Sequence, residues 1–231
     1  MKTKRERRGQ FIIIAVLLAS IMIVSIGALL HTAVTYYKHE PWEEYSTLIG
    51  DIEVNTRRIL ELSLANYTNS VAGEEDAYIL KTNIAKWQNN LTQVYPNSGI
   101  VLTCLSTPQM QTQSWNPRAA ADFRLDIMGI GLSGYEFSLA SSLSLSAIEA
   151  SNSTTTSYTI TAVVQSESGF VPNLGKANFR INDAEVTSVL LTFTDDDVPA
   201  YTIKYDGTFP ATIEVWDERG IRAVDTISAL S

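Results

Sequence analysis

The stretch FIIIAVLLASIMIVSIGALL, residues 11–30, contains no charged residue and only two polar ones, Ser20 and Ser25. A helix of this length extends about 30 Å, which matches the hydrocarbon core of a membrane. The apolar part of a cleaved secretion signal is shorter, roughly 7 to 15 residues. We therefore expect residues 10–37 to form a single-pass membrane helix that the protein retains. Secretion with loss of this segment is the alternative, with small residues at 26–28 as the cleavage site.

Charge is distributed unevenly around this segment. Residues 1–10 contain five basic residues and Glu6, so they carry +4, and the rest of the chain must carry −12 to give the net charge of −8. Basic residues beside a membrane helix stay in the cytoplasm. We therefore expect residues 1–9 to be a cytoplasmic leader and the chain beyond Lys38 to be extracellular. An acidic body argues against a nucleic-acid partner, because phosphate binding requires clustered Lys and Arg.

The basic leader and the start of the apolar segment read KTKRERRGQFIII, residues 2–14. This stretch resembles the class III signal peptide of archaeal type IV pilins and pilin-like surface proteins. In that family a prepilin peptidase cuts after a Gly that ends the leader, and the apolar helix stays with the mature protein. The resemblance implies cleavage between Gly9 and Gln10, with Arg8 before the pair. Phe11 is bulkier than usual after the cut, and Ile14 stands where bacterial pilins carry Glu.

The same resemblance implies a function and a set of partners. The partners would be membrane lipid, the prepilin peptidase and other pilin-like subunits, in a homo- or hetero-oligomer. The apolar helices would pack together in a filament or pseudopilus at the cell surface, and small residues such as Ala15, Ala19 and Gly27 permit close helix approach. The alternative is a static, single-pass anchored protein that displays a binding or adhesion module.

Residues 38–96 have the periodicity of a helical stalk. Pro41 is expected to kink the chain near His39, and Pro96 to end the last helix. Apolar residues recur at spacings of three and four in two stripes, with Asn55 as the polar member of the first. The stripes are Tyr45, Leu48, Ile52, Asn55, Ile59 and Leu62, and then Ala77, Leu80, Ile84, Trp87, Leu91 and Val94.

The pattern changes to period two in residues 97–152, which predicts a β-rich segment, and short strands continue through residues 153–231. Turn residues separate these strands, as in a β-sandwich. The last segment resembles the immunoglobulin-like modules of prokaryotic surface proteins, although no cysteine pair supports this. The fold class expected outside the membrane is therefore α+β, with a helical stalk and an antiparallel β-rich head. The strand signals are residues 123–127, 135–145, 158–164, 176–181, 186–193, 200–205, 212–216 and 221–227.

Two motifs suggest ligand binding at first sight. Residues 129–134, GIGLSG, match a dinucleotide fingerprint, but a strand pattern follows where the fingerprint requires a helix. We predict a turn or bulge there. Residues 194–199, TDDDVP, could offer carboxylates to Ca²⁺ but lack the spaced ligands of a calcium loop. We predict a solvated turn, with calcium binding as the alternative.

The sequence lacks the motifs of common catalytic sites. It contains no H-E-x-x-H, no G-x-S-x-G and no cysteine pair, and its two histidines, His31 and His39, flank the apolar segment. Carboxylates such as Asp217 and Glu218 are expected on the surface. We therefore predict that the protein is not an enzyme and uses no cofactor or metal. A surface hydrolase that uses acidic residues is the remaining alternative.

Four further residues are candidates for modification or reactivity. Cys104 is the only cysteine and lies in an apolar run, so we expect a buried, unreactive thiol, with an intermolecular disulfide as the alternative. Asn66, Asn90 and Asn152 each begin an N-x-[S/T] sequon. Three sequons are close to the chance number for this composition. Asn152 is the best candidate because it falls in a predicted loop, whereas Asn66 would continue an apolar stripe.

Overall fold

The computed structural model describes residues 16–32, 42–70, 78–96, 98–111, 113–152 and 156–228. The chain divides into two compact units, Met1–Asp51 and Ile52–Ser231, which are described separately. In the first unit, residues 16–32 form an α-helix, and a further helix, α2, begins at Trp42. The predicted processing residues Arg8, Gly9 and Gln10 lie outside the described residues, as does the kink predicted near His39.

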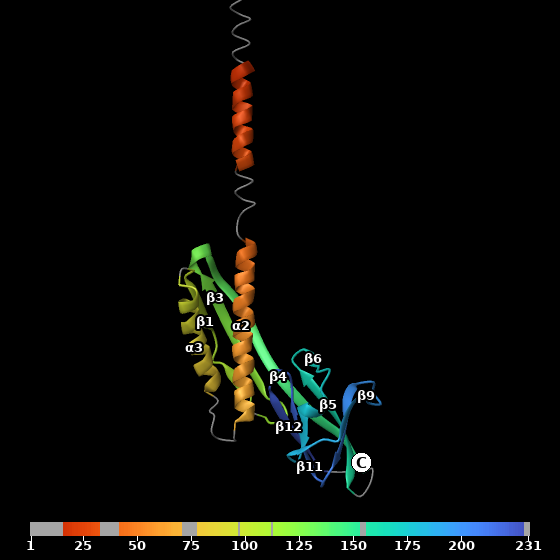
Figure 1. Cartoon of the computed structure of the whole chain (residues 1–231). Coiled ribbons are helices and arrows are strands. Elements are labelled where there is room, and N and C mark those ends of the chain that lie inside the picture. Colours follow the sequence, from red (N-terminus) through yellow and green to blue (C-terminus); the bar gives the residue numbers. More distant parts are fainter. Residues whose placement is uncertain are drawn as a thin grey trace, which may run out of the picture. The chain divides into compact units, whose positions relative to one another are not determined.

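The second unit is an α+β fold with antiparallel sheets, as the sequence predicted (Figure 1). Its helices are α2 (Trp42–Asn69, which enters the unit at Ile52) and α3 (Ile79–Val94). The strands are β1 (Ile100–Cys104), β2 (Gln109–Gln111), β3 (Arg118–Ile127), β4 (Leu132–Asn152), β5 (Ser157–Ser166), β6 (Gly169–Phe170), β7 (Phe179–Ile181), β8 (Ala184–Glu185), β9 (Ser188–Phe193), β10 (Pro199–Asp206), β11 (Ala211–Trp216) and β12 (Arg222–Ile227). Each predicted strand signal overlaps one of these strands, but the signal at 176–181 is only half right, because Lys176–Asn178 form a 3-10 turn and β7 begins at Phe179.

Helices α2 and α3 are joined by side-chain hydrogen bonds. Trp87 Nε1 of α3 donates to Thr56 Oγ1 of α2 at 3.0 Å, and Asn83 Nδ2 donates to Ser63 Oγ at 3.0 Å. Helix α3 also contacts the first sheet, because Gln88 Nε2 donates to the backbone carbonyl of Leu102 in β1 at 3.0 Å. From Ile52 onward, both helices therefore pack beside the sheet of β1, β3 and β4 within the second unit.

The predicted apolar stripe of α2 is right at Ile52 and wrong by about one position after it. Ile52, Leu60 and Leu64 are buried, while Leu62 is 55% exposed and Asn55 is half-buried. Two hydroxyl residues, Thr56 and Ser63, complete the buried face. Their hydroxyls donate to the carbonyls of Ile52 and Ile59, each at 2.6 Å, and this satisfies a polar group that would otherwise be costly to bury.

The stripe predicted for α3 is largely confirmed. Leu80, Ile84 and Leu91 are buried, and Trp87 is half-buried where its indole reaches Thr56. Val94, the last member, is exposed at the end of the helix.

Strand β4 belongs to both halves of the second unit. Residues 132–142 pair with β3 and residues 143–152 pair with β5, in each case antiparallel. A bulge between Ala147 and Glu149 interrupts the second ladder. The first strand of the sandwich therefore comes before residue 153, where the sequence suggested that the sandwich begins. In Figure 1, β4 can be followed from its contact with β3 to its contact with β5.

The sandwich has two antiparallel sheets. One runs in the order β4-β5-β10-β9, and the other in the order β12-β11-β7-β8. The rings of Phe179 in β7 and Tyr201 in β10 meet with centroids 5.5 Å apart, so the two sheets pack face to face. Alternate residues of the strands fill the space between them, as expected for period two. The fully buried members include Ile160, Ala162, Val164, Ile203, Ile213, Val215 and Ala223.

Candidate functional site

The helix of residues 16–32 is apolar around its whole circumference. All of its described side chains are exposed. The exposed fractions of its large apolar side chains lie between 54% for Ile21 and 71% for Ile23 and Val24. A helix that is apolar on every face is normally buried in lipid or among other helices. The described chain supplies no such cover, so this helix is the first part of the candidate site.

Two hydroxyl groups of this helix do not prevent such burial. Ser20 Oγ donates to the carbonyl of Val16 at 2.9 Å, and Thr32 Oγ1 donates to the carbonyl of Ala28 at 2.9 Å. Both hydroxyls are therefore satisfied within the helix and need no water. The helix can enter an apolar environment without leaving these two donors unpaired.

Within the described residues, no helix has both the length and the apolar character needed to cross a membrane. Residues 10–15 and 33–37 of the predicted membrane helix lie outside the described residues.

The second part of the candidate site is the junction between α2 and the β11–β12 turn. Trp216 Nε1 donates to Asn69 Oδ1 at 2.8 Å, and Asn69 Nδ2 donates to the carbonyl of Gly220 at 2.7 Å. The backbone N–H of Arg222 donates to Thr68 Oγ1 at 3.1 Å. These bonds attach the last turn of α2 to the sandwich.

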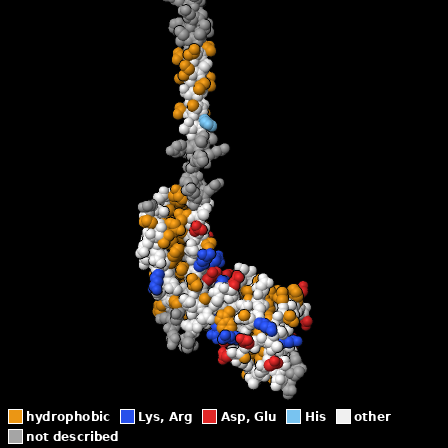
Figure 2. Space-filling model, viewed as in Figure 1, with side chains coloured by type: hydrophobic (Ala, Val, Ile, Leu, Met, Phe, Trp, Pro, Cys, Tyr) orange, Lys and Arg blue, Asp and Glu red, His pale blue; other side chains and the backbone are white. Residues whose placement is uncertain are grey.

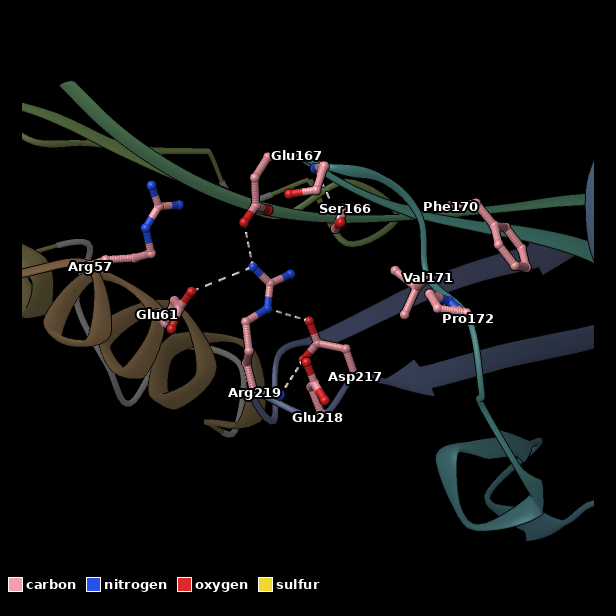
Figure 3. A pocket seen from close by; sticks show the side chains of 11 residues that line it. Arg57, Glu61, Ser166, Glu167, Phe170, Val171, Pro172, Asp217, Glu218 and Arg219 are labelled. Carbon is pink, nitrogen blue, oxygen red and sulfur yellow. Dashed lines mark hydrogen bonds and ion pairs between the residues drawn. The ribbon is translucent and has the colours of Figure 1, made fainter. Parts of the chain in front are cut away.

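Arg219 is the centre of this junction (Figure 3). Its Nε donates to Asp217 Oδ2 at 2.7 Å, and its Nη1 donates to Glu167 Oε1 at 2.7 Å. The same Nη1 donates to Ser141 Oγ at 2.9 Å and lies 3.8 Å from Glu61 Oε1 of α2. We call Glu61, Ser141, Glu167, Asp217 and Arg219 the junction cluster. One guanidinium thus joins α2, β4, the β5–β6 turn and the β11–β12 turn.

The prediction that Asp217 lies on the surface is wrong. Its side chain is buried, and Oδ1 accepts from the backbone N–H groups of Arg219 and Ile221, each at 3.0 Å. The carboxylate therefore shapes the β11–β12 turn as well as binding the guanidinium. The sequence DERG shows that a turn is present, but not that its Arg reaches three distant segments. The contacts to Glu61, Ser141 and Glu167 are non-local and leave no pattern in the sequence.

Two carboxylates of the junction cluster, Glu61 and Glu167, have opposite pKa shifts. Burial raises the pKa of Glu61, and this effect exceeds the lowering by Arg219. Burial would also raise the pKa of Glu167, but hydrogen bonds from the Ser142 N–H and from Arg219 outweigh it and lower the pKa. For Arg219, the bonds to Glu167 and Asp217 overcome the effect of burial and raise the pKa. Glu167 and Arg219 are therefore a strong charge pair, and Glu61 is a weaker third partner.

A hollow opens beside the junction cluster, lined also by Arg57, Phe170, Pro172 and Glu218 (Figure 3). Two of its carboxylates, Glu167 and Asp217, are already hydrogen-bonded to Arg219. Within the described part of the chain, no group of three His, Cys, Asp or Glu residues is arranged to hold a metal ion. The arrangement is suited to holding segments together, and we assign it a structural role.

The three sequon asparagines are all exposed. Asn66 lies on the outer side of α2, so the expectation that it continues the apolar stripe is wrong. Asn90 is exposed on α3. Asn152 is the last residue of β4 and not a loop residue as predicted, although residues 153–155 that follow it lie outside the described part. Glycosylation at these positions stays a prediction.

The two glycine- and aspartate-rich motifs form turns, as predicted. Met128–Ile130 form a 3-10 turn, Gly131 adopts φ 70°, and β4 follows at Leu132. No helix N-terminus is available there for a phosphate. The second motif is the hairpin turn between β9 and β10, in which Asp197 N–H donates to the carbonyl of Thr194 at 2.9 Å. Its three aspartates are exposed.

Cys104 is half-buried at the end of β1, and not fully buried as predicted. Its Sγ donates to the carbonyl of Ser106 at 3.1 Å. Burial raises the pKa of the thiol, so the reactive thiolate is disfavoured. This agrees with an unreactive thiol.

Comparison with profiles of known protein families, with curated proteins and with solved structures gave no match to this chain. The proposals that follow are therefore based on the residues and their geometry.

Proposed function

We propose that the chain is a pilin-like, membrane-anchored surface protein that is cut after Gly9 and assembles through its apolar helix into a filament or pseudopilus. The observation that carries the proposal is the helix of residues 16–32, which is apolar and exposed on every face. The basic leader that ends in Gly9 and continues into this helix adds to it.

Removal of the leader has a clear physical role in this proposal. The basic residues of the leader hold the helix end at the cytoplasmic face of the membrane. Cleavage after Gly9 removes them, and the helix can then leave lipid and pack among its copies. That packing depends on van der Waals contact between helices, because lipid is as apolar as the helix itself.

The second unit would be the external head. The strand orders β4-β5-β10-β9 and β12-β11-β7-β8 support an immunoglobulin-like interpretation. In chain order these strands take the places of A, B, E, D and of G, F, C plus one added strand in that fold. The junction cluster and the shared strand β4 would fix the sandwich to the helical layer, so that the head moves as one body.

The proposal is tested by the mass of the mature N-terminus. The full chain is co-expressed with a prepilin peptidase, extracted from membranes and analysed by mass spectrometry. We expect a chain that begins at Gln10. Gly9→Val should block cleavage because the protease requires a small residue before the cut. Gly27→Val is the matched control, since an added Cβ at Gly27 has no atom within 4 Å, and it should be cut normally.

Three outcomes would contradict the proposal. The first is an unchanged mass in the presence of active peptidase, and the second is cleavage that survives Gly9→Val. The third is a native protein that dissolves without detergent and begins beyond Leu30, as secretion with loss of the helix would give.

A static anchored module is the second candidate function, and the packed sandwich favours it as a display domain. The two candidates differ in assembly and not in topology. Filaments sheared from the cell surface and containing this chain support the pilin-like proposal. A chain that stays monomeric in the membrane after cleavage supports the anchored module.

A further inference from the structure

The edge strands of the second unit differ in whether the chain covers them. At β12, the N–H of Val224 donates to the carbonyl of Ser114 at 2.8 Å, and Asp225 accepts from the N–H of Ala147 at 2.9 Å. At β1, Gln88 donates to the carbonyl of Leu102. Strand β9 is the last strand of its sheet, and within the described residues no other strand pairs with its outer side. It is therefore an open edge of the sandwich, and it is longer than β8, the two-residue last strand of the other sheet.

The backbone of β9 presents hydrogen-bonding groups at this edge. Thr194 pairs with Val198 through a bond from its N–H to the Val198 carbonyl, at 2.9 Å. In an antiparallel ladder the bonded direction alternates from one residue to the next. The N–H and C=O groups of Val189, Leu191 and Phe193 therefore point away from β10. A strand laid beside β9 would meet three donors and three acceptors in register.

The side chains of β9 are apolar and uncovered. Leu191 is 54% exposed and Phe193 is 64% exposed. Both lie on the same face of the sheet as Tyr201, the buried partner of Leu191 in β10. The facing strand β8 has only two residues and does not reach over them. Leu190, on the other side of the strand, is also exposed. Natural edge strands usually carry Lys, Pro or a bulge that prevents pairing. Between Ser188 and Phe193, β9 contains no Lys or Pro, and its register with β10 is unbroken.

The ends of this edge are acidic. Residues 186–194 carry no charge, but Asp195, Asp196 and Asp197 follow directly, and Asp183 and Glu185 precede them. All five of these carboxylates are exposed. Figure 2 shows hydrophobic side chains over this part of the sandwich with acidic side chains beside them. An antiparallel pair of two β9 strands would place the aspartates of one copy beside Glu185 of the other, which like-charge repulsion disfavours.

We propose that β9 is a docking edge for an extended segment of another protein that is apolar at alternate positions and carries Lys or Arg at both ends. The segment adds to the sheet as one more strand, so its backbone bonds to Val189, Leu191 and Phe193. Its apolar side chains cover Leu191 and Phe193, and its basic ends lie near the two groups of carboxylates. Strand addition of this kind takes its affinity from backbone bonds and its specificity from side chains.

The test uses the full chain in non-ionic detergent and a fluorescent probe peptide, KKTVTVTVKK, followed by fluorescence anisotropy. We expect saturable binding that weakens as salt is added. Leu191→Ser should raise the Kd about fivefold, because a half-covered leucine side chain is lost from the contact with the peptide. Leu62→Ser is the matched control: Leu62 is 55% exposed but lies on α2, and this change should leave the Kd within about twofold.

Two further peptides separate the contributions of charge and backbone. EETVTVTVEE should not bind, because its acidic ends meet the acidic ends of the edge. A probe with N-methyl groups on alternate valines should not bind either, because it cannot complete the ladder. Hydrogen exchange of the complex with KKTVTVTVKK should slow at Val189, Leu191 and Phe193.

The proposal is overturned if KKTVTVTVKK fails to saturate at about 1 mM, where the binding free energy is only about −4 kcal/mol. It is also overturned if the acidic or N-methylated peptide binds equally well, or if Leu62→Ser weakens binding as much as Leu191→Ser. Self-association of the chain that Leu191→Ser abolishes, without probe binding, would show instead that the edge pairs with a second copy.

Discussion

Two helices of this protein differ in whether the chain covers their apolar side chains. The helix of residues 16–32 exposes all of its described side chains, most of them apolar, whereas α2 buries Ile52, Leu60 and Leu64 against its own unit. Helix α2 has charged residues such as Arg58 on its outer side, and the helix of residues 16–32 has no Lys, Arg, Asp or Glu at all.

The difference shows where each helix obtains its stability. Most helical stability in proteins comes from packing of an apolar face. Helix α2 finds that packing within the chain, so substitutions there should act on folding. In the proposed function, the helix of residues 16–32 finds that packing in lipid or in other chains, so substitutions there should act on insertion and assembly.

The largest expected effect is on folding through α2. Leu60 is fully buried, and Leu60→Ala should lower the free energy of unfolding of the head by about 2 to 5 kcal/mol, because it removes apolar contact and leaves a cavity. The measurement is urea unfolding of the full chain in detergent, followed by tryptophan fluorescence. Leu17→Ala, at an exposed position of the other helix, should change this free energy by less than about 0.5 kcal/mol. Equal losses in the two variants would refute the contrast.

The next effect concerns the other helix. Ile23→Lys places a charge in the middle of the apolar helix and should disfavour membrane insertion by about 3 kcal/mol. Carbonate extraction of membranes should then release much of the chain, while urea unfolding of the head stays unchanged. Leu62→Lys, at an exposed position of α2, is the matched control and should remain membrane-bound. Release of both variants, or of neither, would show that the apolar helix does not anchor the chain.

A smaller effect is expected at the junction. Arg219→Met leaves the buried carboxylate of Asp217 without its charged partner and should destabilise the head by about 2 kcal/mol. Arg58→Met is the control, because Arg58 is exposed on α2, the helix that the junction cluster contacts, and surface charges contribute little. The two unfolding curves give the comparison directly. If Arg219→Met were as harmless as Arg58→Met, the junction cluster would not hold the two layers together.

The smallest effect is the pH dependence of the junction. The pKa of Glu61 is raised in the folded state, so the folded chain binds more protons than the unfolded chain just above the ordinary glutamate pKa of about 4.3. Stability associated with Glu61 is therefore lost as the pH rises through this window. The pKa of Glu167 is lowered, so its contribution is lost as the pH falls below about 4.3.

The free energy of unfolding, measured at about one-unit steps between pH 3 and 7, would separate the contributions of the two carboxylates. Glu61→Gln should flatten the decline on the neutral side of the window and leave the acid side unchanged. Glu167→Gln should flatten the acid side. If Glu61→Gln altered only the acid side, the prediction that the pKa of Glu61 is raised would be wrong.

The strands and the α3 helix could be predicted from the sequence because their signals are local. Alternation identifies β5, β10 and β11, and spacings of three and four identify the buried Leu80, Ile84 and Leu91. The face of α2 could not be predicted in the same way, because two of its buried residues, Thr56 and Ser63, are polar. They are buried because partners on α3 and the carbonyls one turn earlier satisfy them.

The junction cluster could not be predicted either. Its members come from four separate parts of the chain, and only the short segment from Asp217 to Gly220 looks unusual in the sequence, as a turn. Similarly, the pattern of β9 identifies a strand but does not indicate that it lies at an edge. Strand order decides this, and strand order depends on pairing between distant segments.

The continuity of β4 has a mechanical consequence. A force that pulls the sandwich away from the helical layer along β4 acts on one continuous strand. The first half of this strand is hydrogen-bonded along its length to β3, and the second half to β5. Force in that direction must shear many hydrogen bonds together and cannot peel them one at a time. In a surface protein of the kind proposed, the sandwich would therefore stay attached to the helical layer under tension.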